Sequence, residues 1–131
     1  MPKPSITMVL KPPEWTATHE PADNGQATIS RAAAAGHIHY VTSITCTLEG
    51  IGANTLEVHF VLRDSTTGAG NILWQGKMLN LANTSAPPIA LGGLNIQGVA
   101  GQAVTLETVG SPAAASSATV ALTGYTRPAT D

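Results

Sequence analysis

The chain has 131 residues, of which 43% are apolar and only 11% charged, and its formal net charge is −2. This length suits one domain and allows a core that needs no metal or disulfide. A chain without a basic run lacks the surface for nucleic acid binding, a single cysteine excludes a disulfide framework, and no apolar run approaches the ~20 residues of a membrane-spanning helix.

The low charge is the most informative part of the composition. An average soluble domain has roughly 25% charged residues, which help to keep it soluble, against 11% here. A chain with so few is expected to cover part of its surface with copies of itself or with a partner. The alternative is a surface of uncharged polar residues, since Thr, Ser, Asn and Gln are frequent.

Residues 1–25 differ from the rest because they hold five of the nine prolines, around one short apolar piece at 6–10. Proline cannot donate to a central strand, so we expect an arm, an edge strand or a loop. The interrupted apolar piece also argues against a signal peptide. We divide the chain into a Pro-rich arm (1–25), a β-domain (26–126) and a polar tail (127–131). The arm could reach a neighbouring molecule or wrap along its own domain.

The segment from 37 to 63 predicts two long strands with one buried face each. Apolar residues fall on even positions on both sides of a Gly-containing segment at 50–54, which we interpret as a hairpin turn. This period of two places Tyr40, Cys46 and Phe60 inward. It places His37, His39 and His59 on the polar face.

Further strands are expected at 26–31, 71–79, 89–91 with 94–96, 102–109 and 118–125. In the 71–79 strand, Ile72, Trp74 and Met78 share one face, and Leu73 and Leu79 share the other. About eight short strands without a helix predict an all-β, single-domain antiparallel β-sandwich. A jelly roll is favoured over an immunoglobulin-like sandwich, because the chain has no Cys…Trp…Cys framework.

Catalytic and metal-binding patterns are weak. Three histidines could bind zinc, but in a hairpin His59 would lie over 10 Å along from His39 at ~3.3 Å per residue. We therefore expect no metal or cofactor, and His37, His39 and His59 remain weak metal candidates. No nucleophile elbow occurs, and Glu57 and Glu107 are expected on solvated faces. Among the aromatic residues, Trp15 and Tyr125 are expected to be available for contacts.

Four runs carry a resemblance to a known family: AAAAGHIHYVTSITCTL, VLRDSTTGAGNILWQGKM, LGGLNIQGVAGQAVTLET and ATVALTGY. Across about residues 32 to 126, this pattern resembles small virion proteins of tailed phages. The resemblance implies a jelly roll related to the tumour-necrosis-factor fold, no enzymatic activity, and a role in capsid decoration as a cement protein on the capsid exterior.

The resemblance also implies partners. We expect a homotrimer, with a dimer as the alternative, bound to the lattice of the major capsid protein. The interface candidates are Ile6, Val9, Trp15, Leu73, Leu79 and Tyr125. Two other functions stay open: a receptor- or glycan-binding module of a head fibre or tail on the same fold, and a small cupin-like metalloenzyme using the three histidines.

Overall fold

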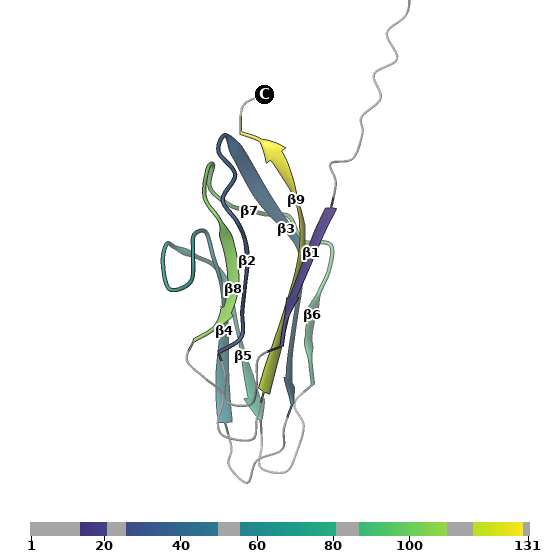
Figure 1. Cartoon of the computed structure of the whole chain (residues 1–131). Helices are drawn as coiled ribbons and strands as arrows, with labels where there is room; N and C mark the ends of the chain where they lie inside the picture. The colour runs from purple at the N-terminus through teal and green to yellow at the C-terminus, as the bar shows by residue number, and fades with distance from the viewer. Residues whose placement is uncertain (1–13, 21–25, 50–55, 81–86, 110–116, 130–131) are drawn as a thin grey trace, which may run out of the picture.

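The computed structural model describes residues 14–20, 26–49, 56–80, 87–109 and 117–129. Over these residues the chain forms two antiparallel sheets that face each other as a sandwich (Figure 1), which confirms the predicted all-β class. No helix that could cross a membrane occurs in these segments. The strands are β1 (Glu14–His19), β2 (Thr28–Arg31), β3 (His37–Glu49), β4 (Leu56–Arg63), β5 (Ile72–Asn80), β6 (Ile89–Leu91), β7 (Ile96–Gln97), β8 (Val104–Thr108) and β9 (Ser117–Pro128).

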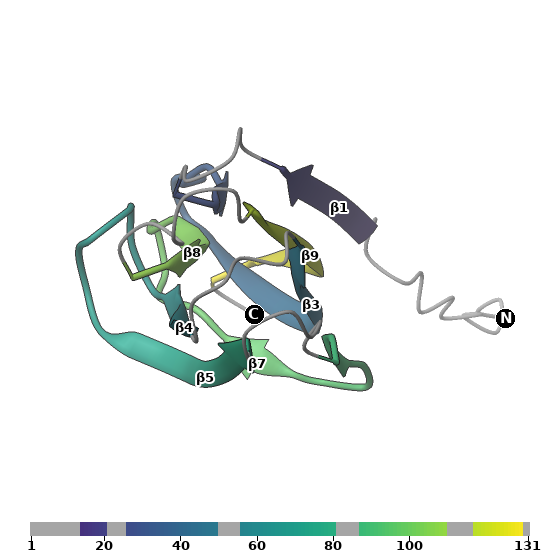
Figure 2. The same cartoon turned by 90° about the horizontal axis from the view of Figure 1, so that it is seen from below.

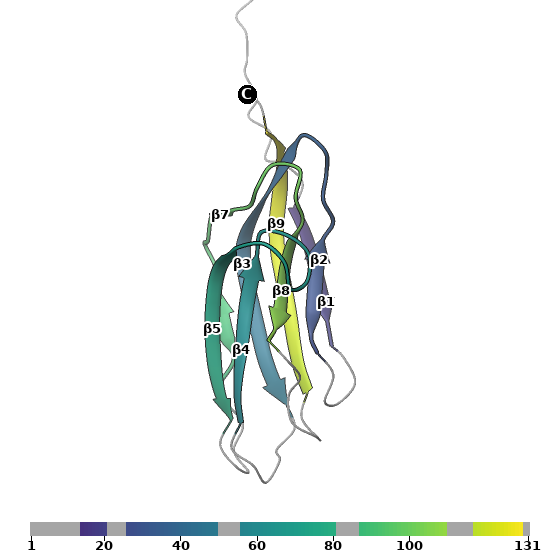
Figure 3. The same ribbon diagram turned by 90° about the vertical axis from the view of Figure 1, so that its left-hand side faces the viewer.

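The two sheets differ in the strands that form them and in the length of their ladders. Sheet A has the order β1-β9-β3-β6, with β7 also paired to β3, and sheet B has the order β2-β8-β4-β5. Figure 2 looks along the sandwich, and Figure 3 turns sheet B toward the viewer. The longest ladder joins β3 to β9, running from His37 opposite Pro128 to Glu49 opposite Ser117.

The core lies between the sheets and is built from alternating residues of their central strands. From sheet B come Phe60, Leu62, Val104 and Leu106, all fully buried, as the period-two pattern predicts. Cys46 of sheet A is also fully buried, and burial raises the pKa of its thiol to about 12. The other buried sheet A residues of the core are Trp15, Val41, Ile44, Leu48, Ala118, Val120 and Leu122.

The predicted hairpin between residues 37–49 and 55–63 is wrong. β3 pairs with β9, β6 and β7, whereas β4 pairs with β5 and β8. The two strands face each other across the core instead of sharing a sheet. A Gly-rich connection permits either a hairpin or a crossing between sheets, and local alternation is the same in both.

A β-bulge in β3 overturns the predicted orientation of its first half. The register with β9 shifts between Val41 and Ser43, so Thr42 is an extra residue. Beyond it, Ile44, Cys46 and Leu48 point inward as predicted. Before it the alternation is reversed: His39 and Val41 are buried, while Tyr40 lies on the outer face.

A second register shift, between Leu62 and Arg63, changes the start of β5. Trp74 and Met78 reach the core as predicted, but Ile72 is 47% exposed, and Leu73, predicted on the opposite face, packs partly against the core. An irregular pair at the strand start leaves room for Leu73 to turn inward.

Strand β1, the first that the structure describes, stands at one end of the described order of sheet A and pairs with β9. Trp15 is opposite Gly124, and the indole fills the space that a side chain at Gly124 would take. An added Cβ at Gly124 would overlap the Tyr40 carbonyl oxygen and lie 2.6 Å from Trp15 Cζ2. Gly124 is therefore what allows Trp15 to enter the core.

We predict that Gly124→Ala destabilises the fold by about 1–3 kcal/mol, because the new methyl group must displace the β3 backbone or the indole. Urea unfolding followed by tryptophan fluorescence measures this. Gly92→Ala is the matched control, since nothing lies within 4 Å of a Cβ added there, and it should change the free energy of unfolding by less than about 0.5 kcal/mol. Equal small effects of both variants would contradict the packing of Trp15 against Gly124.

Candidate interaction surface

His39, predicted on the polar face, is 1% exposed and belongs to a buried polar cluster. Its Nε2 lies 2.7 Å from the carbonyl oxygen of Ala32, and its Nδ1 lies 2.7 Å from the Thr126 hydroxyl. Trp15 Nε1 donates to the same hydroxyl at 3.0 Å, and the indole meets the imidazole edge-on. If His39 is the tautomer protonated at Nε2, each donor of these three hydrogen bonds has an acceptor. His39 therefore ties β1 and the 32–36 connection to the core.

The three histidines do not come together. His39 is buried on the inner face of sheet A, whereas His59 is on the outer face of sheet B and bonds Glu57 at 2.8 Å. His37, at the start of β3, is exposed and its Nδ1 lies 2.9 Å from the carbonyl oxygen of Ala35. Among the described residues, no group of three or more His, Cys, Asp or Glu side chains could hold a metal ion, and no pocket is formed.

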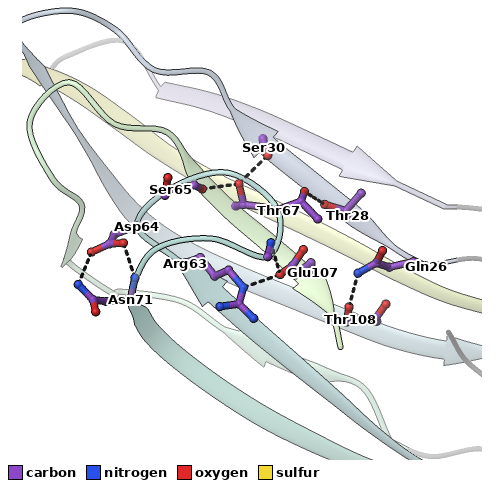
Figure 4. A network of polar contacts seen from close by, with 12 residues as sticks. Gln26, Thr28, Ser30, Arg63, Asp64, Ser65, Thr67, Asn71, Glu107 and Thr108 are labelled. Carbon is purple, nitrogen blue, oxygen red and sulfur yellow. Dashed lines mark hydrogen bonds and ion pairs between the residues drawn. The ribbon is translucent and has the colours of Figure 1, made fainter. Parts of the chain in front are cut away.

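The loop between β4 and β5, residues 64–71, folds back over the outer face of sheet B (Figure 4). Asp64 closes the base of this loop, since its Oδ1 accepts from the backbone N–H of Asn71 at 2.7 Å. Above the sheet, Thr105 donates to the Ser65 carbonyl oxygen at 2.7 Å, and Thr67 bonds Thr28 at 3.0 Å. The loop contains no large apolar side chain, so these polar contacts hold it in place.

Glu107 lies beneath this loop and is 2% exposed, contrary to the predicted solvated position. Its Oε1 accepts from Arg63 Nε at 2.5 Å and from the Gly68 N–H at 3.0 Å. Its Oε2 has no hydrogen-bond partner, unlike the other buried side-chain polar atoms of the described segments. The strand pattern correctly places Glu107 on the outer face of β8, but only the fold shows that a loop covers that face.

The part of the sheet B outer face that the 64–71 loop does not cover has exposed ionisable side chains. Glu57, His59 and Lys77 point outward from β4 and β5, with Lys77 Nζ 3.3 Å from Glu57 Oε1. The hydrogen bond from His59, and then that from Lys77, lower the pKa of Glu57. With Arg63 at the loop, this face has the ordinary charged character of a solvated surface.

The outer face of sheet A is different, because Thr, Ser and Ala cover its middle. In the middle rows of the ladder of β1, β9 and β3, from the row of Thr16 to the row of Thr47, the outward residues are uncharged, and Thr16 bonds Thr123 across the strands at 3.3 Å. Of the described side chains on this face, Glu14 and Arg127 alone are charged, and both lie toward one end. The uncharged members are Thr16, Thr18, Ser43, Thr45, Thr47, Ala90, Thr119, Ala121 and Thr123.

An aromatic cluster stands beside these residues. Tyr40 and Tyr125 are opposite each other in the β3–β9 ladder, and their rings stack with centroids 4.9 Å apart and an interplanar angle of 9°. The Arg127 guanidinium lies 5.1 Å from the Tyr125 centroid and 5.9 Å from that of Tyr40. The Tyr125 hydroxyl donates to Asn95 Oδ1 at 2.9 Å. Tyr and Arg are the residues that most often dominate protein interfaces.

The predicted interface candidates therefore lie in different parts of the molecule. Tyr125 is on the outer face of sheet A, whereas Trp15 is 8% exposed in the core and is unavailable as a contact. Leu73 packs partly on the core. Ile6, Val9 and the side chain of Leu79 lie outside the described part of the chain.

Sequence reasoning missed Tyr40 as a surface residue, because the bulge at Thr42 reverses the alternation. The signal in the sequence was the alternation of Thr and Ser with apolar residues along β1, β3 and β9, which indicates that each of these strands has one polar outer side. Nothing local shows that these three strands are neighbours.

Comparison with models of protein families, with curated proteins and with solved structures finds no match to this chain.

We predict that Glu107→Gln lowers the free energy of unfolding by about 1–3 kcal/mol, because half-buried Arg63 loses its counter-charge. Glu57→Gln is the matched control: it removes an ion pair that is exposed to solvent, so it should change the urea midpoint much less than Glu107→Gln does. Urea unfolding of both variants compares them. If Glu107→Gln is as mild as the control, the Arg63–Glu107 pair does not stabilise the loop.

Proposed function

We propose that this chain is a non-enzymatic structural protein of a tailed-phage virion, a capsid decoration or cement protein that binds the head lattice from outside. The observation that carries the proposal is the uneven distribution of charge. Sheet B carries charged Glu57, Lys77 and Arg63 on its outer face, whereas the middle of the sheet A face is uncharged. We infer that sheet A makes a protein contact and sheet B faces solvent.

The chemistry of the sheet A face suits such a contact. Thr hydroxyls both donate and accept, and a face without charge loses little hydration energy when another protein covers it. The stacked pair Tyr40–Tyr125, with Arg127 above it, adds residues typical of binding hot spots. The resemblance of residues 32 to 126 to phage virion proteins supplies the biological setting, and with it a jelly roll of the tumour-necrosis-factor type.

A protein that binds only the assembled head stabilises that state by mass action. At a free concentration of about 100 times the dissociation constant, each occupied site contributes roughly 2.7 kcal/mol. Many copies on one lattice would therefore raise the temperature of head disruption without any catalytic step.

The second candidate is a glycan- or receptor-binding module. The observation that favours it is the polar surround of the tyrosine pair, where Asn95 bonds Tyr125 and Gln97 is the register partner of Tyr40. Small-molecule sites combine aromatic side chains with a few placed polar groups, and Asn and Gln amides are among these groups.

We predict that the purified protein binds heads that lack it and raises their disruption temperature, measured by light scattering on heating. Heads that neither bind the protein nor change in temperature would contradict the cement function. Binding to a sugar array, with loss in Tyr125→Ala, would instead support the second candidate.

A further inference from the structure

We propose that the outer face of sheet A binds the same face of a second copy, about a two-fold axis that runs parallel to the strands along the boundary between β9 and β3. This inference rests on the proposed function, because it names the partner of the contact surface described there. The strand registers determine which residues of the two copies would meet.

A two-fold axis in this position exchanges β9 with β3 and keeps each row of the ladder opposite itself. Tyr40 and Tyr125 share a row, so Tyr40 of one copy meets Tyr125 of the other, and four rings gather at the interface. Thr45 and Ala121 also share a row, so each meets the other across the contact. Two copies of one twisted sheet can pack with their strands within about 30° of each other.

Among the side chains that the structure describes on this face, the same operation brings no like charges together. Arg127 shares a row with Ile38, so the guanidinium of one copy meets the isoleucine of the other. Glu14 lies in the row of Tyr125, which extends through Tyr40 to Gln97 at the other side of the sheet. Glu14 therefore meets the Gln97 amide of the second copy, which can donate to the carboxylate.

A second copy fits this face better than a charged partner does. A partner that presents Lys or Glu to the rows of Thr and Ala would leave that charge desolvated and unpaired. The matching surface has to be uncharged and flat, and the sheet A face is such a surface. Sheet B is unsuited to the same contact because Glu57, His59 and Lys77 are exposed on it.

The size of the face limits the strength of this contact. A standard interface uses roughly 20–30 residues a side and buries about 800 Å² on each partner. The outward residues of four strands fall below that number, so the dimer should dissociate on dilution. Because the contact is largely uncharged, salt should have little effect on it.

The first experiment is sedimentation velocity of the full-length protein over a wide concentration range, at low and high salt. We expect a reversible monomer–dimer equilibrium that changes little with salt. Thr45→Lys should weaken it at least about tenfold, since the ammonium would be buried against Ala121 of the second copy. The matched control is Gln75→Lys, at an exposed position of β5 on sheet B, which should leave the equilibrium unchanged.

A cross-linking experiment tests the axis. Thr45→Cys and Ala121→Cys proteins are oxidised separately and as a mixture; buried Cys46, whose pKa is about 12, does not interfere. The two-fold axis predicts that the mixed disulfide dominates. Cross-linking of Ala121→Cys mainly with itself would overturn this axis.

Failure of this inference can be told apart from failure of the proposed function. A wild-type protein that is monomeric at all concentrations, or a dimer that Thr45→Lys leaves intact, overturns the pairing of sheet A faces. If that monomer still protects heads from heat, the cement function stands and the face has another partner. Circular dichroism of Thr45→Lys and Gln75→Lys confirms that both variants remain folded.

Discussion

The long antiparallel ladder between β3 and β9, with its single irregularity at Thr42, is the constraint on which the other features depend. It places β1 on one side and β6 and β7 on the other, and so defines sheet A. The extra residue reverses the alternation of β3, which buries His39 and turns Tyr40 outward. One inserted residue thus decides both the polar cluster in the core and the aromatic cluster on the surface.

Two sets of buried polar groups, one between the sheets and one beneath the 64–71 loop, are held by specific partners. His39 and Trp15 share the Thr126 hydroxyl, and Glu107 binds Arg63 and the Gly68 N–H beneath the 64–71 loop. A buried polar group costs free energy unless it is hydrogen-bonded, so these contacts select one arrangement of the edge strand and one of the loop. These contacts give His39 and Glu107 a structural role, although both residue types also occur in catalytic and metal sites.

The same distribution explains how a chain with 11% charged residues exposes an uncharged face. Arg63 and Glu107 lie at and under the loop, and Glu57 and Lys77 are on the open part of sheet B. Among the described side chains on the outer face of sheet A, Glu14 and Arg127 are the charged ones, and both lie toward one end. Within the described residues, exposed charged side chains on sheet B contrast with an uncharged middle of sheet A, and this contrast is the physical basis for proposing that sheet A makes a protein contact.

The sequence alone determined the all-β class, most of the strands and the inward residues of the regular ones, such as Phe60, Leu106 and Cys46. Alternation is a local property, so it survives without knowledge of pairing. The tertiary structure alone decided that β3 and β4 belong to different sheets, that Trp15 is core and that Glu107 is covered. Each of these depends on a contact between segments far apart in the chain: β3 with β9, Trp15 with Gly124 and Thr126, Glu107 with Arg63 and Gly68. A period of two cannot encode such pairings, because every strand order and every register shift by an even number of residues preserves it.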